Sequence, residues 1–199
     1  MNHGRLHWYE PAELDEGQKA LYDEIVGGPR AGQANIAVLT DNDGRLQGPF
    51  NAFLLDPVLG EAVQALGAAI RYRTRLSDRL REIAILAVAC SERSNFEWDA
   101  HHAIGKSVGI TDEELAALGA GADAESFDDE DRLVSKLTRA LVRGGDLDDA
   151  LFAEAVAALG EAQLFDLIVL VGHYEMLARS LRVWRTPIPA GAVPRFPTS

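Results

Sequence analysis

Three residues in the stretch SNFEWDAHHAIGKSVGI, residues 94–110, have the types and spacing of a proton-transfer site. In a helix, Ser94, Glu97 and His101 lie within a sector of about 60° on one face, so their side chains can converge. An ionised glutamate one turn from a histidine raises the imidazole pKa, and the pair can then move a proton near neutral pH. The stretch therefore indicates a candidate acid–base site.

The same letters also match an ordinary helix start. Ser94 and Glu97 have the S-x-x-E spacing of a capping box, in which the two side chains satisfy free backbone N–H groups. His101 is then a surface imidazole with no chemical role. Because the N-terminus of a helix also favours a bound anion, a cap and a site can coexist, and both interpretations stay open.

Glu82 is the second residue of interest, because it falls in the segment expected to be most buried. An ionised carboxylate in that position needs a partner. Arg79 and Arg81 are close by in sequence, so a salt bridge at the rim explains Glu82 as well as a functional role does.

A shared metal ion is not expected near these residues. Asp99 and His102 lie three residues apart on a helical face turned away from Glu97 and His101, so the four side chains cannot easily hold one ion. The paired Glu-x-x-His motifs of di-metal carboxylate bundles have no counterpart in a suitable position. We therefore expect a site without metal or cofactor.

The elements that must position these residues are predicted to be helices. Apolar residues recur at helical spacing, and Ser, Thr, Gly and Pro mark the starts and stops. On this basis we expect helices over residues 11–27, 56–73, 77–90, 94–108, 111–118, 130–143, 148–159 and 161–183. The helix over 77–90 is apolar on most faces and is expected to be central.

Two segments are expected to be non-helical. Residues 35–53 carry turn signals and are predicted to form an ordered loop or a small hairpin that turns at residues 42–44. The tail, residues 184–199, contains four prolines and is predicted to be extended. Because no long linker interrupts the chain, the sequence predicts a single all-α domain over residues 1–199 with a short N-terminal hairpin or loop.

Composition argues against several classes of partner. The 199 residues include 19 basic and 31 acidic side chains, a formal charge of −12, which repels phosphate backbones and anionic lipids. Cys90 is the single cysteine, so the chain needs no oxidising compartment. The start lacks the apolar run of a signal peptide, and apolar runs elsewhere are far shorter than the roughly 20 residues that span a bilayer. We expect a cytoplasmic protein that binds neither nucleic acid nor membrane.

Four segments together resemble the carboxymuconolactone decarboxylase family, which includes the alkylhydroperoxidase D branch. They are LQGPFNAFLLDPVLGEAV, RLREIAILAVA, NFEWDAHHAIGKSVGITDEEL and LFDLIVLVGHYEMLARSL, within residues 46–183. The resemblance implies a helical bundle of the alkylhydroperoxidase D-like type. It also implies homotrimers or homohexamers that act on a small-molecule substrate.

The chain departs from the peroxidase branch of that family at both thiols. In that branch a glutamate is followed twelve residues later by Cys-x-x-Cys, with a histidine four beyond the second cysteine. The matching positions are Glu82, Ser94, Glu97 and His101. Because reduction of a peroxide by a dithiol needs a thiolate and a resolving thiol, that chemistry is not expected. Cys90 has the setting of an inert core cysteine.

What remains resembles the branch without thiols, whose namesake enzyme decarboxylates a small lactone acid. The resemblance implies that His101 is the general acid or base, that Glu97 is its partner or a substrate contact, and that Glu82 orients it or relays a proton. An alkylhydroperoxidase-like peroxide-handling protein and a non-catalytic helical oligomer are the alternatives.

Further residues are expected to line the pocket. Ser94 would hydrogen-bond substrate or cap its helix, and Asn51, next to Phe50 in the family-like segment, would be a polar contact. The remaining expected contributors are Gly48, Pro49, Trp98, His102, His173 and Tyr174. Packing is an alternative role for Trp98, and a satisfied core histidine is an alternative for His173.

Overall fold

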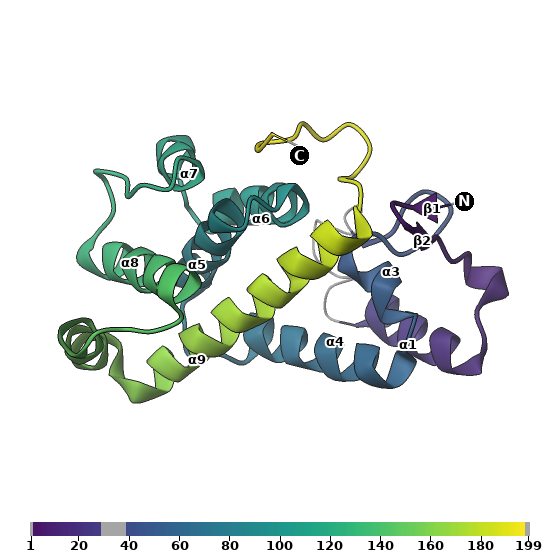
Figure 1. Cartoon of the computed structure of the whole chain (residues 1–199), viewed down its shortest axis with the longest axis horizontal. Coiled ribbons are helices and arrows are strands. Elements are labelled where there is room, and N and C mark those ends of the chain that lie inside the picture. Colours follow the sequence, from purple (N-terminus) through teal and green to yellow (C-terminus); the bar gives the residue numbers. More distant parts are fainter. Residues whose placement is uncertain (1, 29–38, 198–199) are drawn as a thin grey trace. The chain divides into compact units, whose positions relative to one another are not determined.

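The computed structural model describes residues 2–28 and 39–197, and helices dominate them (Figure 1). The prediction of an all-α fold is confirmed. The elements are β1 (Asn2–His3), β2 (Leu6–His7), the 3-10 helix η1 (Pro11–Glu13), α1 (Glu16–Gly27), α3 (Pro49–Phe53), α4 (Pro57–Tyr72), α5 (Asp78–Ser91), α6 (Asn95–Ser107), α7 (Asp112–Gly119), α8 (Asp129–Gly144) and α9 (Asp149–Trp184).

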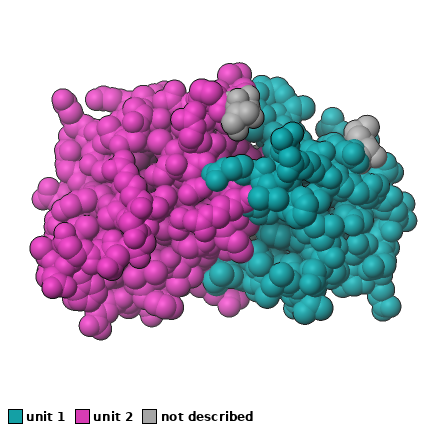
Figure 2. Space-filling view, viewed as in Figure 1, with its two compact units in different colours: residues 1–69, 180–192 teal, residues 70–179, 193–199 magenta. Residues whose placement is uncertain are grey.

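Contacts within the chain divide it into two compact units (Figure 2). Unit 1 comprises residues 1–69 and 180–192, and unit 2 comprises residues 70–179 and 193–199. Helices α4 and α9 each begin in one unit and end in the other, and the chain changes unit once more in the tail, between residues 192 and 193. The single domain expected over the whole chain stays a prediction.

Unit 1 begins its helical part differently from the predicted helix over 11–27. Pro11 starts only a 3-10 turn, and Leu14 is extended. Asp15 then opens α1 with a capping box shared with Gln18. Two competing starts so close together prevent one continuous helix, and the end of α1 at Gly27 agrees with the prediction.

The predicted turn at residues 42–44 is present. Thr40 and Leu46 form an antiparallel bridge, and Gly44 adopts a left-handed φ of 79° in the turn between them. Residues 35–38 of the expected loop lie outside the described residues. The loop prediction is wrong at its end, where α3 forms a short helix with its proline at the first position.

Helix α5 is the centre of unit 2 and packs on α6, α7 and α8. The side chain of Ser77 caps it by accepting a hydrogen bond from the backbone N–H of Leu80 at 3.2 Å. Every residue from Leu80 to Ala89 is buried, so the predicted central helix is confirmed. A glutamate in this segment is necessarily surrounded by protein.

A glycine divides α9 where the sequence predicted two helices. Gly160 has φ 75° and ψ 160°, a combination open to glycine alone, so the helix breaks between residues 159 and 161.

By length and composition alone, α9 is long and apolar enough to cross a membrane, a test that core helices of soluble proteins also pass. The short apolar runs of the sequence did not suggest this. Buried residues nevertheless recur at helical spacing, as at Leu164, Leu167 and Val171, which is typical of a helix with one face in a core.

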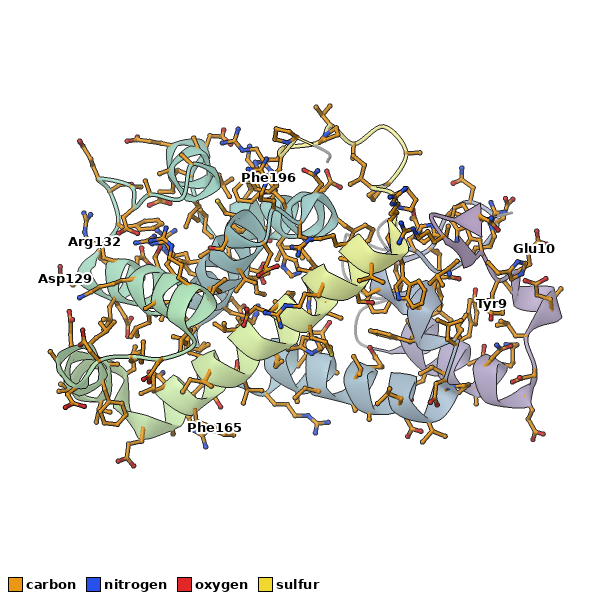
Figure 3. All side chains as sticks on the ribbon, in the orientation of Figure 1. Tyr9, Glu10, Asp129, Arg132, Phe165 and Phe196 are labelled. Carbon is orange, nitrogen blue, oxygen red and sulfur yellow. The ribbon has the colours of Figure 1, made fainter. Side chains whose placement is uncertain are left out.

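The described part of the tail, residues 185–197, contains no helix or strand but is not simply extended, because it turns where the Ala192 N–H donates to the Pro189 carbonyl. Its residue Phe196 is docked on α6. Phe196 is buried, its backbone N–H donates to the Asn95 side chain at 2.7 Å, and its ring lies 5.7 Å from the Trp98 ring (Figure 3). The guanidinium of Arg195 also lies over Trp98, at 5.9 Å. The tail therefore covers the first turn of α6.

Candidate acid–base site

Helix α6 begins without the capping box that its sequence allows. Ser94 occupies the N-cap position, but its side chain makes no cap hydrogen bond within the described part of the chain. Its backbone N–H instead donates to the Ala89 carbonyl at 2.8 Å. The capping interpretation of Ser94 and Glu97 is therefore wrong. A capping box does form between Thr111 and Glu114 at the start of α7, the helix predicted over residues 111–118.

Glu82 and His101 are joined across the contact between α5 and α6. His101 Nδ1 lies 2.7 Å from Glu82 Oε2. The exposed fractions are 0% for Glu82 and 4% for His101, so both groups are removed from bulk water. The interpretation of His101 as a surface imidazole is excluded by this burial.

Glu97 faces the opposite nitrogen of the same ring. Its Oε2 lies 3.7 Å from His101 Nε2, and the residue is 4% exposed. One helical turn separates the two residues on α6, as the spacing predicted. The imidazole is thus placed between two buried carboxyl groups that come from different helices.

The two carboxyl groups have pKa values shifted in opposite directions. Burial by itself raises the pKa of Glu82, but the charge of His101, its hydrogen bond, and Arg71 and Arg81 outweigh burial and lower the pKa. Burial raises the pKa of Glu97, Glu82 adds to the rise, and His101 and Arg71 only partly oppose it. Because the two pKa values are shifted apart, Glu82 is the group that stays ionised and Glu97 is the group that holds a proton.

This charge distribution sets the tautomer of the histidine. An ionised Glu82 can only accept, so Nδ1 of His101 carries the hydrogen that it donates. Nε2 then faces Glu97, which holds its proton more tightly than an ordinary glutamate. The arrangement can therefore pass a proton between Glu97, Nε2 and a bound molecule.

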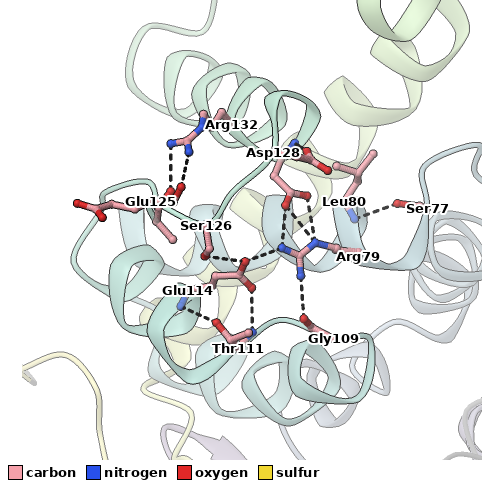
Figure 4. Close-up of polar contacts among 12 residues, drawn as sticks. Ser77, Arg79, Leu80, Gly109, Thr111, Glu114, Glu125, Ser126, Asp128 and Arg132 are labelled. Atoms are coloured by element: carbon pink, nitrogen blue, oxygen red, sulfur yellow. Dashed lines mark hydrogen bonds and ion pairs between the residues drawn. The ribbon is translucent and has the colours of Figure 1, made fainter.

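Only one of the two arginines near Glu82 forms an ion pair with it, and that pair is buried rather than at the rim. Arg81 Nε is 3.4 Å from Glu82 Oε1, although neither atom has a hydrogen bond among the described residues. Arg79 instead pairs with Glu114 (Figure 4) and with Asp131. Arg71, at the end of α4, acts on both carboxyl groups and was missed from the sequence, where it looks like an ordinary last-turn cation.

Two carboxyl oxygens of the site are left without a hydrogen bond. Glu82 Oε1 and Glu97 Oε1 are buried and have no hydrogen-bond partner among the residues that the structure describes. Buried polar atoms are almost always hydrogen-bonded, and exceptions gather where ligands or protons are handled. Both unpaired oxygens belong to the carboxyl groups that flank His101, which is where a proton or a bound molecule would be handled.

Aromatic residues close one side of the imidazole. The Tyr174 ring lies 5.2 Å from the His101 ring and nearly perpendicular to it, at 86°. His173 is buried and contacts the same tyrosine at 5.4 Å. The sequence predicted that both residues border the site; Tyr174 lies against the His101 ring, whereas a contact of His173 with substrate stays a prediction.

Other predicted site residues are placed differently. Trp98 is buried and packs on Phe196, with His102 6.1 Å away, so the structure gives Trp98 the packing role. Ser94 is buried at the start of α6. The roles of Ser94 and His102 in binding a substrate stay predictions.

Asn51 and Phe50 belong to unit 1. Asn51 is fully buried, donates to the His7 carbonyl at 2.9 Å and accepts from the Tyr9 N–H at 3.3 Å. These bonds tie α3 to the N-terminal segment, a structural role that was not predicted. Phe50 packs against Phe53, with ring centroids 5.7 Å apart. The predicted contact of Asn51 and Phe50 with substrate stays a prediction.

Comparisons with known proteins agree with this description. Residues 57–140 match the model of the carboxymuconolactone decarboxylase family. A search of the curated proteins finds no match. An uncharacterised peroxidase-related protein from Ralstonia eutropha JMP134, described as an alkylhydroperoxidase AhpD core, aligns over 100% of both chains with 14% identity and a TM-score of 0.74.

A second solved structure has a similar fold. It is a protein of unknown function from Agrobacterium tumefaciens, described as a candidate antioxidant defence protein, AhpD. The alignment covers 72% of this chain and 99% of that one, with 16% identity and a TM-score of 0.65. The chain therefore matches the carboxymuconolactone decarboxylase family model over residues 57–140, and its helical fold is similar to that of the two AhpD-like structures.

Proposed function

We propose that the protein is an enzyme that acts on a small organic acid or lactone by acid–base chemistry. The observation that carries the proposal is the position of His101 between the buried Glu82 and Glu97, at 2.7 and 3.7 Å. Opposite pKa shifts of the two carboxyl groups fit a proton donor and a positioning carboxylate. The match of residues 57–140 to the carboxymuconolactone decarboxylase family model supports decarboxylation as the reaction.

The steps follow from the protonation states. The bond between the substrate carboxylate and its neighbouring carbon breaks, carbon dioxide leaves, and the electron pair stays on the substrate as an enolate. Glu97 gives its proton to that carbon. His101, whose Nδ1–H is held by Glu82, then takes up a proton from solvent on Nε2 and passes it to Glu97, which restores the starting state. Glu82 remains ionised throughout and keeps the ring oriented.

The proposal is tested with a panel of lactone acids and β-keto acids, and turnover is measured as release of carbon dioxide. His101→Ala and Glu97→Gln are each expected to lower kcat by about 10²-fold or more, because each removes a proton carrier. Glu113→Gln, an exposed glutamate on α7, is the matched control and keeps full activity. Unchanged kcat in both site variants would remove the assignment.

Peroxide handling is the second candidate function, because both similar structures are described as AhpD proteins. Against it, Ser94 and Glu97 stand at the thiol positions of the peroxidase branch, and Cys90 is the only sulfur nucleophile. Reduction of an organic hydroperoxide in the presence of a dithiol, lost in Cys90→Ser, would favour the peroxidase. Turnover of a lactone acid or β-keto acid that is lost in His101→Ala and kept in Cys90→Ser would favour the acid–base enzyme.

We also propose a cytoplasmic homotrimer or homohexamer. Exposed apolar side chains support association, among them Phe165, Ile168 and Met176 on one face of α9. Light scattering after size exclusion measures the mass directly. A monomer at micromolar concentration would contradict the assembly and favour a different role for this face.

A further inference from the structure

Unit 2 contains a cavity whose lining residues do not belong to the acid–base site. Its volume is about 390 Å³, in the range of small-molecule sites. The C-terminal end of α5, the connection after α7 and the last turns of α8 line it, with Cys90, Arg93, Leu118, Arg139, Val142 and Arg143 among the residues. Because Cys90 follows Glu82 by eight helical residues, about 12 Å of α5 separates the two places.

The lining of this cavity is positively charged in an acidic protein. Three arginines and only one acidic residue, Glu92, contribute to it, although the whole chain carries −12. Guanidinium groups bind carboxylates and phosphates through paired hydrogen bonds, and they remain charged at every physiological pH. An anion is therefore the ligand that the lining attracts.

Two of the arginines lie one turn apart on α8. Arg139 is held in place by Asp123, at 2.8 and 2.9 Å, and by the Ser135 hydroxyl at 2.6 Å, so its charge is already partly balanced. Arg143 follows four residues later and lines the same cavity, so the two guanidinium groups can contact one anion.

The third arginine occupies a position that favours glycine. Arg93 has φ 54°, in the left-handed region, directly after α5. The helix ends there with the Ser94 N–H donating to the Ala89 carbonyl, a pattern whose left-handed residue is usually glycine. An arginine costs stability at this place, which points to a use for its side chain.

We propose that this cavity binds a small organic anion, with its carboxylate or phosphate on Arg93, Arg139 and Arg143. The apolar part of the ligand lies on Leu118 and Val142, which also line the cavity. This site does not depend on the proposed acid–base chemistry, because it shares no residue with it.

Calorimetric titration of the full-length protein with inorganic phosphate, succinate and benzoate tests the proposal. At least one of these anions is expected to bind, and the preferred one identifies the ligand as a phosphate, a dicarboxylate or an aromatic acid. Arg93→Gly and Arg143→Gln are each expected to weaken that binding by about tenfold or more. Arg179→Gln, an exposed arginine on α9, is the control and leaves the affinity unchanged.

Folding is checked separately by thermal melting. Arg93→Gly places a glycine where the backbone favours one, so its Tm is expected to stay within about 2 °C of the wild type or to rise. Weaker binding with an intact fold then reports on the side chain alone. No binding of any of the three anions, or equal weakening in Arg179→Gln, would overturn the proposal.

Cys90 provides an independent reading of the same cavity. It is the single cysteine of the chain, and it lines the site. The bound anion is expected to slow alkylation of its thiol by iodoacetamide in the wild type, and not in Arg93→Gly. Protection that persists in the variant would place the anion elsewhere.

Discussion

His101 Nδ1 and Glu82 Oε2 lie 2.7 Å apart although nineteen residues separate them in the chain. The contact joins the central helix α5 to α6 and leaves Nε2 of the ring facing Glu97. A carboxylate behind a histidine holds the ring in one orientation and one tautomer, which is how such pairs support proton transfer.

Replacement of Glu82 by Gln tests this relationship. The amide is neutral and can present an N–H to Nδ1, so the imidazole no longer has its fixed tautomer. We expect kcat to fall by about 10²-fold or more and the pH dependence of kcat to shift, because the histidine loses its charged partner. Steady-state kinetics from pH 5 to 9 measure both. A variant that keeps kcat and the wild-type pH profile contradicts the positioning role.

Replacement of Glu97 by Gln is expected to stabilise the protein at alkaline pH. Burial raises the pKa of Glu97 above its usual value of 4.5, so between 4.5 and the raised pKa the folded state binds a proton that the unfolded state has lost. Wild-type stability therefore falls as pH rises through that interval, while the neutral amide is unaffected. Thermal melts from pH 4 to 8 should show a gain for the variant that grows with pH. A difference in Tm that stays constant with pH argues against a proton-holding Glu97.

The ion cluster around Arg79 is expected to be a main contributor to the stability of unit 2. Its guanidinium contacts Asp131 at 2.7 Å and Glu114 at 2.8 Å, and it donates to the Gly109 carbonyl at 2.9 Å (Figure 4). Arg79→Met leaves two buried carboxylates without their cation, so the free energy of unfolding should fall by about 3–5 kcal/mol. Urea denaturation measures this loss.

Arg75 provides the matched comparison. It forms an ion pair with Asp166 at 3.6 Å, but its side chain is 64% exposed. Arg75→Met should lower the free energy of unfolding by no more than about 1 kcal/mol, because solvent screens the pair. Similar losses in Arg75→Met and Arg79→Met would show that burial of the cluster is not what makes it important.

Two glycines of α9 are predicted to respond in opposite directions to alanine. Gly160→Ala forces a side chain into a backbone region that only glycine adopts, so it should lower the free energy of unfolding by about 1–3 kcal/mol. Gly172 is helical, with open space where a Cβ would be, so Gly172→Ala should raise it by about 0.5–1 kcal/mol. Denaturation of both variants settles the sign, and a stabilising Gly160→Ala would show that the two halves of α9 prefer to be continuous.

Local signals predicted most of the helices of the chain. The predicted starts at residues 77 and 111 and the predicted break between residues 159 and 161 are all present. Ser77 caps α5, Thr111 and Glu114 form a capping box, and Gly160 divides α9, each through a preference that acts within a few residues. The prediction for residues 11–27 was wrong because two start signals, at Pro11 and Asp15, compete within one turn. Apolar spacing alone does not rank such signals.

The sequence by itself determined the helical class and the face that Glu97 and His101 share, because helical periodicity is a local property. Its motifs also indicated the family whose model matches residues 57–140. Only the tertiary structure decided that Ser94 and Glu97 form no capping box. It also decided that Glu82 contacts His101 rather than Arg79, and that Asn51 is hydrogen-bonded to the N-terminal segment. Those choices depend on which helices meet and on how much water they exclude. Burial and partner geometry of this kind arise from contacts between distant residues, and a spacing pattern along the chain does not contain them.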